Sequence, residues 1–271
     1  KRMTKGDAEQ TVRDDEPQGP LEAFADTMAA IFVEQQEMIV RGLQSIKSIT
    51  LPLGSVTKEA SDADIARLMA QLKDTYADEI EAAAEGLIEP VITEGWAAGL
   101  AEVDQFGLDV VNPFDVTNPD VADFLQANTV QLTQQIENYT ERQLTDFIAQ
   151  GLDQGLTTDQ MARGLQDDVS NAGGVLSPAR ARTIARTESA RAFSRGKLQS
   201  WKDVDQIERK KWRLAANACQ YCKAIAKIVN AGGGTLLDDP FLPKGTVLTG
   251  TQGGSLSLDY EDILTDPLHP N

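Results

Sequence analysis

The stretch from Asn118 to Gly151, NPDVADFLQANTVQLTQQIENYTERQLTDFIAQG, decides the fold class of this 271-residue chain. Its apolar residues recur at the three- and four-residue spacing of one helix face. They are Val121, Phe124, Leu125, Leu132, Ile136, Tyr139, Leu144 and Ile148. Asn118 followed by Pro119 is a typical helix start, because asparagine caps the first turn and proline needs no N–H partner there. The stretch therefore predicts one long helix that ends at Gly151.

Helical spacing extends to both sides of this stretch. Upstream, one helix is expected over residues 21–49. A second is expected to begin at a capping box of Ser61 and Asp64 and to bend or break near Pro90. These patterns predict a helical N-terminal region.

Two shorter helix starts follow downstream. Thr157 and Gln160 have the spacing of a capping box, which predicts a short helix over Met161 and Leu165. Ser177 followed by proline predicts the start of a basic helix over residues 177–201.

The composition changes after this helix. Glycines cluster at 232–234 and 253–254, and residues 245–249 have the composition of a strand. We therefore predict an α+β fold, mainly α: a helical N-terminal region followed by a small β-rich C-terminal module. The expected domains are a disordered or linker segment (1–19), an acidic helical assembly region (20–150), and a third domain (151–271) that contains the basic helix 177–201 and the β-rich module 206–271.

Charge is distributed unevenly along the chain. The net charge is −17, from 25 basic and 42 acidic residues. Residues 1–176 carry a net −21, residues 177–213 a net +7, and residues 214–271 a net −3. The overall charge argues against a protein that coats nucleic acid over its whole surface, but it leaves room for a local basic patch.

Several classes of protein are disfavoured by composition. No run of 18 apolar residues is present, so no transmembrane helix is expected. Two cysteines are too few for a secreted disulfide scaffold, and a reducing cytosol fits best. The chain begins at Lys1 and ends at Asn271, and we expect it to be a piece of a longer polypeptide.

Cys219-Gln220-Tyr221-Cys222 is the sharpest local chemical signal. Two thiolates at this spacing can bind one side of a tetrahedral Zn²⁺, and the single histidine, His269, supplies a third ligand. Two other interpretations stay open. The cysteines could be ordinary structural thiols on a turn, or a redox pair, although the chain shows no βαβ unit of the thioredoxin kind.

The basic helix supports two interpretations. At 100° per residue, Arg182 and Arg186 share one side with Lys197, while the other arginines lie nearly opposite. Those others are Arg180, Arg191 and Arg195. One interpretation is a surface that binds a partner or the phosphates of nucleic acid. The other is a packed helix whose arginines pair with the acidic part of the chain.

Other candidates for chemistry are weak. The glycines at 232–234 lack the Gly-Lys-Ser/Thr ending of a phosphate loop, which favours a turn. With His269 as the only histidine, a Ser/His or Cys/His mechanism has no plausible base, and we expect no enzyme. Glu188, Trp201 and Trp212 are interpreted as structural residues.

Four motifs in order resemble the phage Mu F-like minor head protein family over about residues 150–271. They are Arg-Thr-Ile-Ala-Arg-Thr-Glu at 182–188, Lys-Trp-Arg at 211–213, Cys-x-x-Cys at 219–222 and Pro-Leu-His-Pro-Asn at 267–271. The chain departs from the family in two places. At residues 215–218 members often carry an aspartate and a hydrophobic residue, and at the position of Tyr221 they commonly carry proline.

The resemblance implies a non-enzymatic structural protein of a tailed bacteriophage, a minor head protein that acts in head morphogenesis at the portal vertex. It is expected in the virion in multiple copies, after assembly in the host cytoplasm, and some relatives are fused to a portal protein. The implied partners are the portal protein, other head proteins and packaged DNA, with no membrane.

The resemblance also implies where the fourth metal ligand would come from. In the family the terminal His-Pro-Asn is typically followed by Cys-Arg-Cys. A structural Zn²⁺ is therefore expected on Cys219, Cys222 and His269, with the fourth ligand beyond Asn271. The alternative function is a DNA-binding or ejected internal virion protein that uses the basic helix 177–201.

Overall fold

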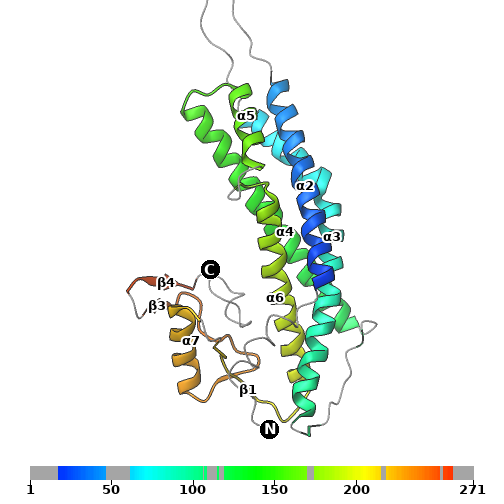
Figure 1. The fold of residues 1–271 in the computed structure, drawn as a ribbon, viewed down its shortest axis with the longest axis vertical. Helices are drawn as coiled ribbons and strands as arrows, with labels where there is room; N and C mark the ends of the chain where they lie inside the picture. Colours follow the sequence, from blue (N-terminus) through cyan, green and yellow to red (C-terminus); the bar gives the residue numbers. More distant parts are fainter. Residues whose placement is uncertain are drawn as a thin grey trace, which may run out of the picture. The chain divides into compact units, whose positions relative to one another are not determined.

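The computed structural model describes residues 18–46, 62–105, 107–108, 115, 119–169, 174–214, 218–250 and 253–258. Over these ranges the chain is mainly helical, with short strands near its C-terminal end (Figure 1). This confirms the predicted fold class, α+β and mainly α. Within the described residues, no helix combines the length and apolar character needed to cross a bilayer.

The elements follow one another with helices first. The helices are α2 (Gln18–Ser45), α3 (Asp62–Asp104), α4 (Pro119–Asp153), α5 (Thr158–Val169), α6 (Pro178–Lys202) and α7 (Gln220–Ala231). The strands are β1 (Arg209–Lys210), β2 (Thr235–Leu236), β3 (Val247–Thr249) and β4 (Ser255–Ser257). β1 pairs with β2 and β3 pairs with β4, both antiparallel.

Two compact units share the chain. Unit 1 takes its described residues from 89–121 and 189–258, and unit 2 takes them from 18–88 and 122–188. Both α3 and α6 therefore contribute residues to both units. The predicted domain boundary at residue 150 stays a prediction.

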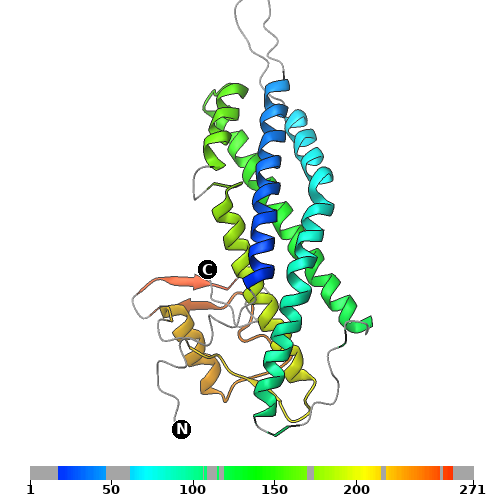
Figure 2. The same cartoon turned by 45° about the vertical axis from the view of Figure 1, so that its right-hand side comes forward.

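Unit 2 is a bundle of helices around an aliphatic core. In both views α2 lies alongside the first part of α3 (Figure 1 and Figure 2). α2 also packs against α5, and the buried side chain of Gln36 donates from Nε2 to the carbonyl oxygen of Leu165 at 2.6 Å. The fully buried large residues of this unit include Met28, Phe32, Ile39, Leu43, Ile80, Leu87, Leu144, Ile148, Met161 and Leu165.

The two downstream helix starts are confirmed in detail. The backbone N–H of Thr157 donates to Oε1 of Gln160 at 2.8 Å, and the N–H of Gln160 donates back to Oγ1 of Thr157 at 3.2 Å. Ser177 caps α6 by accepting from the N–H of Arg180 at 3.2 Å. In both helices a side chain satisfies an N–H group that lacks an intrahelical partner.

Two details of the helices differ from expectation. α3 was expected to bend or break near Pro90, and it does not break there; the carbonyl of Gly86, which loses its N–H donor, is on an exposed residue where water can bind it. α2 begins at Gln18, so it includes two residues of the predicted linker, and Pro20 lies in the first turn, which tolerates proline. Residues 1–17 and the predicted caps Ser61 and Asn118 lie outside the described residues.

Unit 1 contains a close approach of two helix backbones. Glycines stand where α3 meets the second half of α6. A Cβ atom added at Gly196 would overlap the backbone of Ile92 and Trp96, and one at Gly95 would overlap the backbone of Phe193. The two helices can pack at this distance only because these positions carry no side chain.

We predict that Gly196→Ala lowers the free energy of unfolding by about 1–3 kcal/mol, because the added methyl group forces two backbones apart. Gly86→Ala is the matched control on α3, since a Cβ there has no neighbour within 4 Å. The control should raise stability by up to about 1 kcal/mol through helix propensity. Urea unfolding followed by circular dichroism measures both. Equal effects of the two substitutions would contradict the close packing.

Candidate functional site

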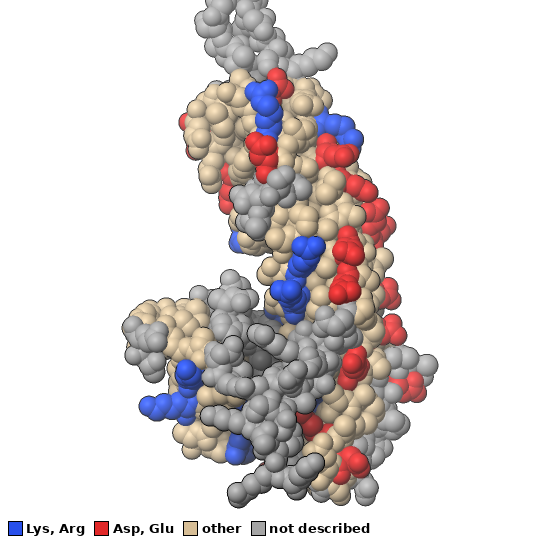
Figure 3. Space-filling model, in the orientation of Figure 1, with Lys and Arg blue, Asp and Glu red and all other residues tan. Residues whose placement is uncertain are grey.

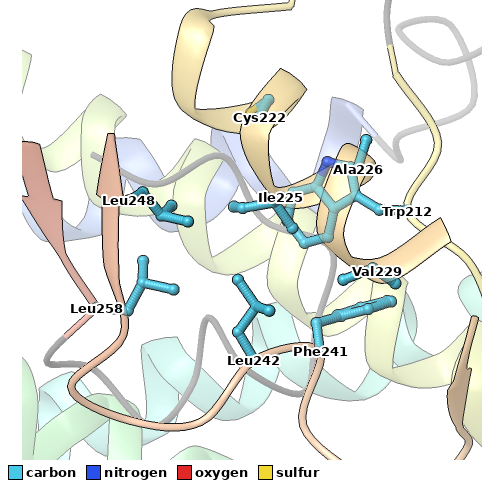
Figure 4. Close-up of a cluster of buried hydrophobic side chains, with 9 residues drawn as sticks. All are labelled: Trp212, Cys222, Ile225, Ala226, Val229, Phe241, Leu242, Leu248 and Leu258. Atoms are coloured by element: carbon cyan, nitrogen blue, oxygen red, sulfur yellow. The ribbon is translucent and has the colours of Figure 1, made fainter. Parts of the chain in front are cut away.

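The C-terminal part of unit 1 is a small module built around α7. Its buried face is formed by Cys222, Ile225, Ala226 and Val229, at the spacing of one helix face. These side chains meet residues from the segments before and after the helix (Figure 4). Those residues are Trp212, Phe241, Leu242, Leu248 and Leu258.

Trp212 is fixed in this core from two sides. Its ring packs edge-on against Phe241, with centroids 5.1 Å apart and an interplanar angle of 83°. The side-chain amide of Asn230 accepts from the N–H of Trp212 at 3.0 Å and donates to its carbonyl oxygen at 2.9 Å. The end of α7 is thereby tied to the segment that precedes it.

A buried cation completes the module. Lys210 is only 3% exposed, donates to the carbonyl oxygen of Leu237 at 2.9 Å, and lies over the ring of Phe241 at 4.9 Å from the centroid. A carbonyl oxygen and an aromatic face both stabilise an ammonium group that has lost water.

The two cysteines lie at the start of α7. Cys219 is the N-cap residue, and its Sγ accepts a hydrogen bond from the backbone N–H of Cys222 at 3.3 Å. Cys219 is partly exposed, whereas Cys222 is buried, and neither forms a disulfide. The Cys-x-x-Cys motif is thus one helical turn in which both sulfurs lie near the helix N-terminus.

The surroundings of the two thiols shift their pKa values in opposite directions. Burial raises the pKa of Cys222 to about 12, assisted by its hydrogen bond to Cys219. Partial burial also acts to raise the pKa of Cys219. Hydrogen bonds from Cys222 and the backbone of Tyr221, with the charge of Lys223, outweigh it and hold the pKa below the ordinary thiol value. Cys219 is therefore the reactive member of the pair.

The donor set is compatible with part of a zinc site. A sulfur at a helix N-cap that accepts backbone N–H bonds has the charge stabilisation that a metal-binding thiolate needs. Among the described residues, no third His, Cys, Asp or Glu joins these two in a cluster that could hold a metal ion. His269, the predicted third ligand, lies outside the described residues.

α7 is the element that the sequence analysis missed in this module. Among the described residues of the module, the expected β-rich character is present as two short antiparallel ladders. The signal for the helix is the apolar spacing of Cys222, Ile225, Ala226 and Val229, which lies inside the segment 206–271 that was predicted to be β-rich.

Arg180 of α6 lies inside unit 2. Its guanidinium donates to the carbonyl oxygen of Val175 at 2.6 Å and to Oγ1 of Thr140 at 3.0 Å. It also lies over the rings of Phe32 and Tyr139, at 4.7 and 4.8 Å from their centroids. Burial lowers its pKa to about 10, so it stays charged at neutral pH. At this position the half-buried arginine packs within the bundle, and its role in partner binding stays a prediction.

The other arginines of α6 differ in exposure. Arg182 and Arg186 are exposed, and Arg191 and Arg195 are half-buried with contacts of their own. In Figure 3, acidic side chains form a row down the right-hand side, over α3. A smaller number of basic side chains lie to the left of this row.

The three residues predicted to be structural are placed as follows. Glu188 is buried, Trp212 lies in the module core, and the half-buried Trp201 has the Lys197 ammonium 5.6 Å from its ring centroid.

No family model, curated protein or solved structure matches this chain.

We predict that iodoacetamide alkylates Cys219 more than about tenfold faster than Cys222 in the folded protein at pH 8, because only Cys219 has an appreciable thiolate fraction. Mass spectrometry of quenched samples measures the two rates. In urea both cysteines should react alike, which provides the control. Equal rates in the folded protein would show that the two environments do not differ.

Proposed function

We propose that this chain is a non-enzymatic structural protein of a tailed bacteriophage, a minor head protein that acts in head morphogenesis at the portal vertex. One observation carries the proposal. Two of the motifs that resemble the Mu F-like family, Lys211-Trp212-Arg213 and Cys219-x-x-Cys222, contribute Trp212 and Cys222 to the same small core. Motifs that are weak singly gain weight when they build one module.

Unit 2, the helical bundle, supplies the assembly surface in this proposal. Asp74, Asp78, Glu81 and Glu85 recur on α3 at the spacing of one helix face, and all four are exposed. Like charges in such a row repel one another at a cost of a few tenths of a kcal/mol per pair. A basic surface on a neighbouring head protein would relieve that repulsion.

In this proposal Cys219, Cys222 and His269 would hold a structural zinc ion. Zinc supplies a cross-link there, with no redox chemistry. The helix N-terminus orients the first sulfur, and the module core fixes the second. Zinc content per chain, compared between Cys219→Ser and the exposed control Lys227→Ser on the same helix, tests this assignment: only the cysteine variant should lose the metal.

DNA binding is the second candidate, and Arg182 with Arg186 favours it. The two are exposed one helical turn apart, which suits contact with successive phosphates. If they bind DNA, Arg182→Gln with Arg186→Gln should reduce the slope of log K against log salt by about 2, and Arg163→Gln on α5 should leave it unchanged.

The decisive test is the composition and shape of phage particles. In a host that produces the particles, we expect the chain to co-purify with heads at a copy number far below that of the major capsid protein. Quantitative mass spectrometry of gradient-purified particles measures this. Deletion of the coding sequence should yield aberrant or empty heads by electron microscopy. The chain's absence from particles, together with normal heads after deletion, would overturn the proposal.

A further inference from the structure

A small cavity lies in unit 2 where α2, α3 and α4 meet. Its polar lining comes from all three helices, and aliphatic side chains of α3 complete the wall. The polar residues are Gln35 of α2, Lys73 and Tyr76 of α3, and Glu137, Thr140 and Glu141 of α4. The proposed head function makes no use of this site.

Two oxygen atoms of the lining have no hydrogen-bond donor. They are Oε1 of Gln35 and Oε1 of Glu137, and both are shielded from bulk solvent. Gln35 is 3% exposed and the side chain of Glu137 is 7% exposed. A buried acceptor without a donor costs about 1–3 kcal/mol, and a charged acceptor costs more.

Neighbouring groups do not supply the missing donors. Nζ of Lys73 lies 3.6 Å from Oε2 of Glu137, the other oxygen of that carboxylate. Oγ1 of Thr140 donates to the carbonyl oxygen of Ile136 at 2.7 Å and accepts from Arg180. Burial raises the pKa of Glu137 in spite of Lys73, as expected for a carboxylate that is short of donors.

The size of the cavity limits its occupant. About 10 Å³ is open to the centre of a water-sized molecule, which is the space that a single water needs. A water has two hydrogens to donate, and two residues of the lining, Gln35 and Glu137, each carry one acceptor without a donor. A metal cation is disfavoured because the Lys73 ammonium already places positive charge beside the carboxylate.

We propose that this cavity is a binding site for one structural water, which donates one hydrogen bond to Oε1 of Gln35 and the other to Oε1 of Glu137. The water joins α2 to α4 at a point where α3 borders the same space. It thereby fixes the register of α2 against α4 with a polar contact that their aliphatic faces cannot supply.

Two measurements on the full chain test the site. A crystal structure should show one water within about 2.7–3.2 Å of both oxygens. In solution, oxygen-17 magnetic relaxation dispersion detects long-lived internal waters, and Gln35→Met should lose one of them. Met has a similar volume and removes the acceptor. Glu137→Met is the second variant, with the same expected loss.

The matched control is the next residue along α2. Gln36 is also buried, but its Nε2 bonds to the carbonyl oxygen of Leu165, away from the cavity. Gln36→Met should therefore leave the number of long-lived waters unchanged. The proposal is overturned if the two oxygens find donors within the protein and no water is present, if density at the site has metal coordination distances, or if the cavity variants and the control lose water equally.

Discussion

Unit 1 depends on the contact between two helix backbones that no side chain separates. Gly95 and Gly196 let α3 and the second half of α6 approach until backbone atoms of one helix occupy the space where a Cβ of the other would stand. Polar contacts hold the same helix pair. Nε1 of Trp96 donates to Asp203 at 3.0 Å, and Lys197 pairs with Glu102 at 2.7 Å. The C-terminal module comes directly after α6 in the chain, so the helix pair holds the residue at which the module starts.

Much of the helical architecture could be predicted because it is recorded in local spacing. Apolar periodicity and capping residues fix where a helix starts, and the reciprocal bonds of Thr157 and Gln160 show how local that information is. The unbroken course of α3 through Pro90 could not be predicted in the same way. Loss of one backbone hydrogen bond matters little when the freed carbonyl is exposed and the rest of α3 is packed. A sequence does not state that exposure.

The sequence could predict which residues form the candidate site. It could not predict the surroundings of each side chain. The Cys-x-x-Cys spacing placed two sulfurs on one turn, but their opposite pKa shifts come from burial beside Trp212 and from backbone N–H groups. A helical projection places Arg180 and Arg182 on nearly opposite sides of the basic helix, but it does not say which side is buried. Only the packed structure shows that one lies between two aromatic rings and the other lies in solvent. Gln35 falls at an apolar-face position of the helix predicted over residues 21–49, as the one polar exception, but the spacing alone does not say what its amide contacts.

The amide of Asn230 has a consequence for the ageing of the protein. Its oxygen accepts from Trp212 and its nitrogen donates to the same residue, so both halves of the group are in use. Hydrolysis of this amide to a carboxylate would keep an acceptor and remove the donor, and it would bring a negative charge against the carbonyl oxygen of Trp212. Deamidation of this one side chain over time would thus weaken the link between α7 and the tryptophan at the core of the C-terminal module.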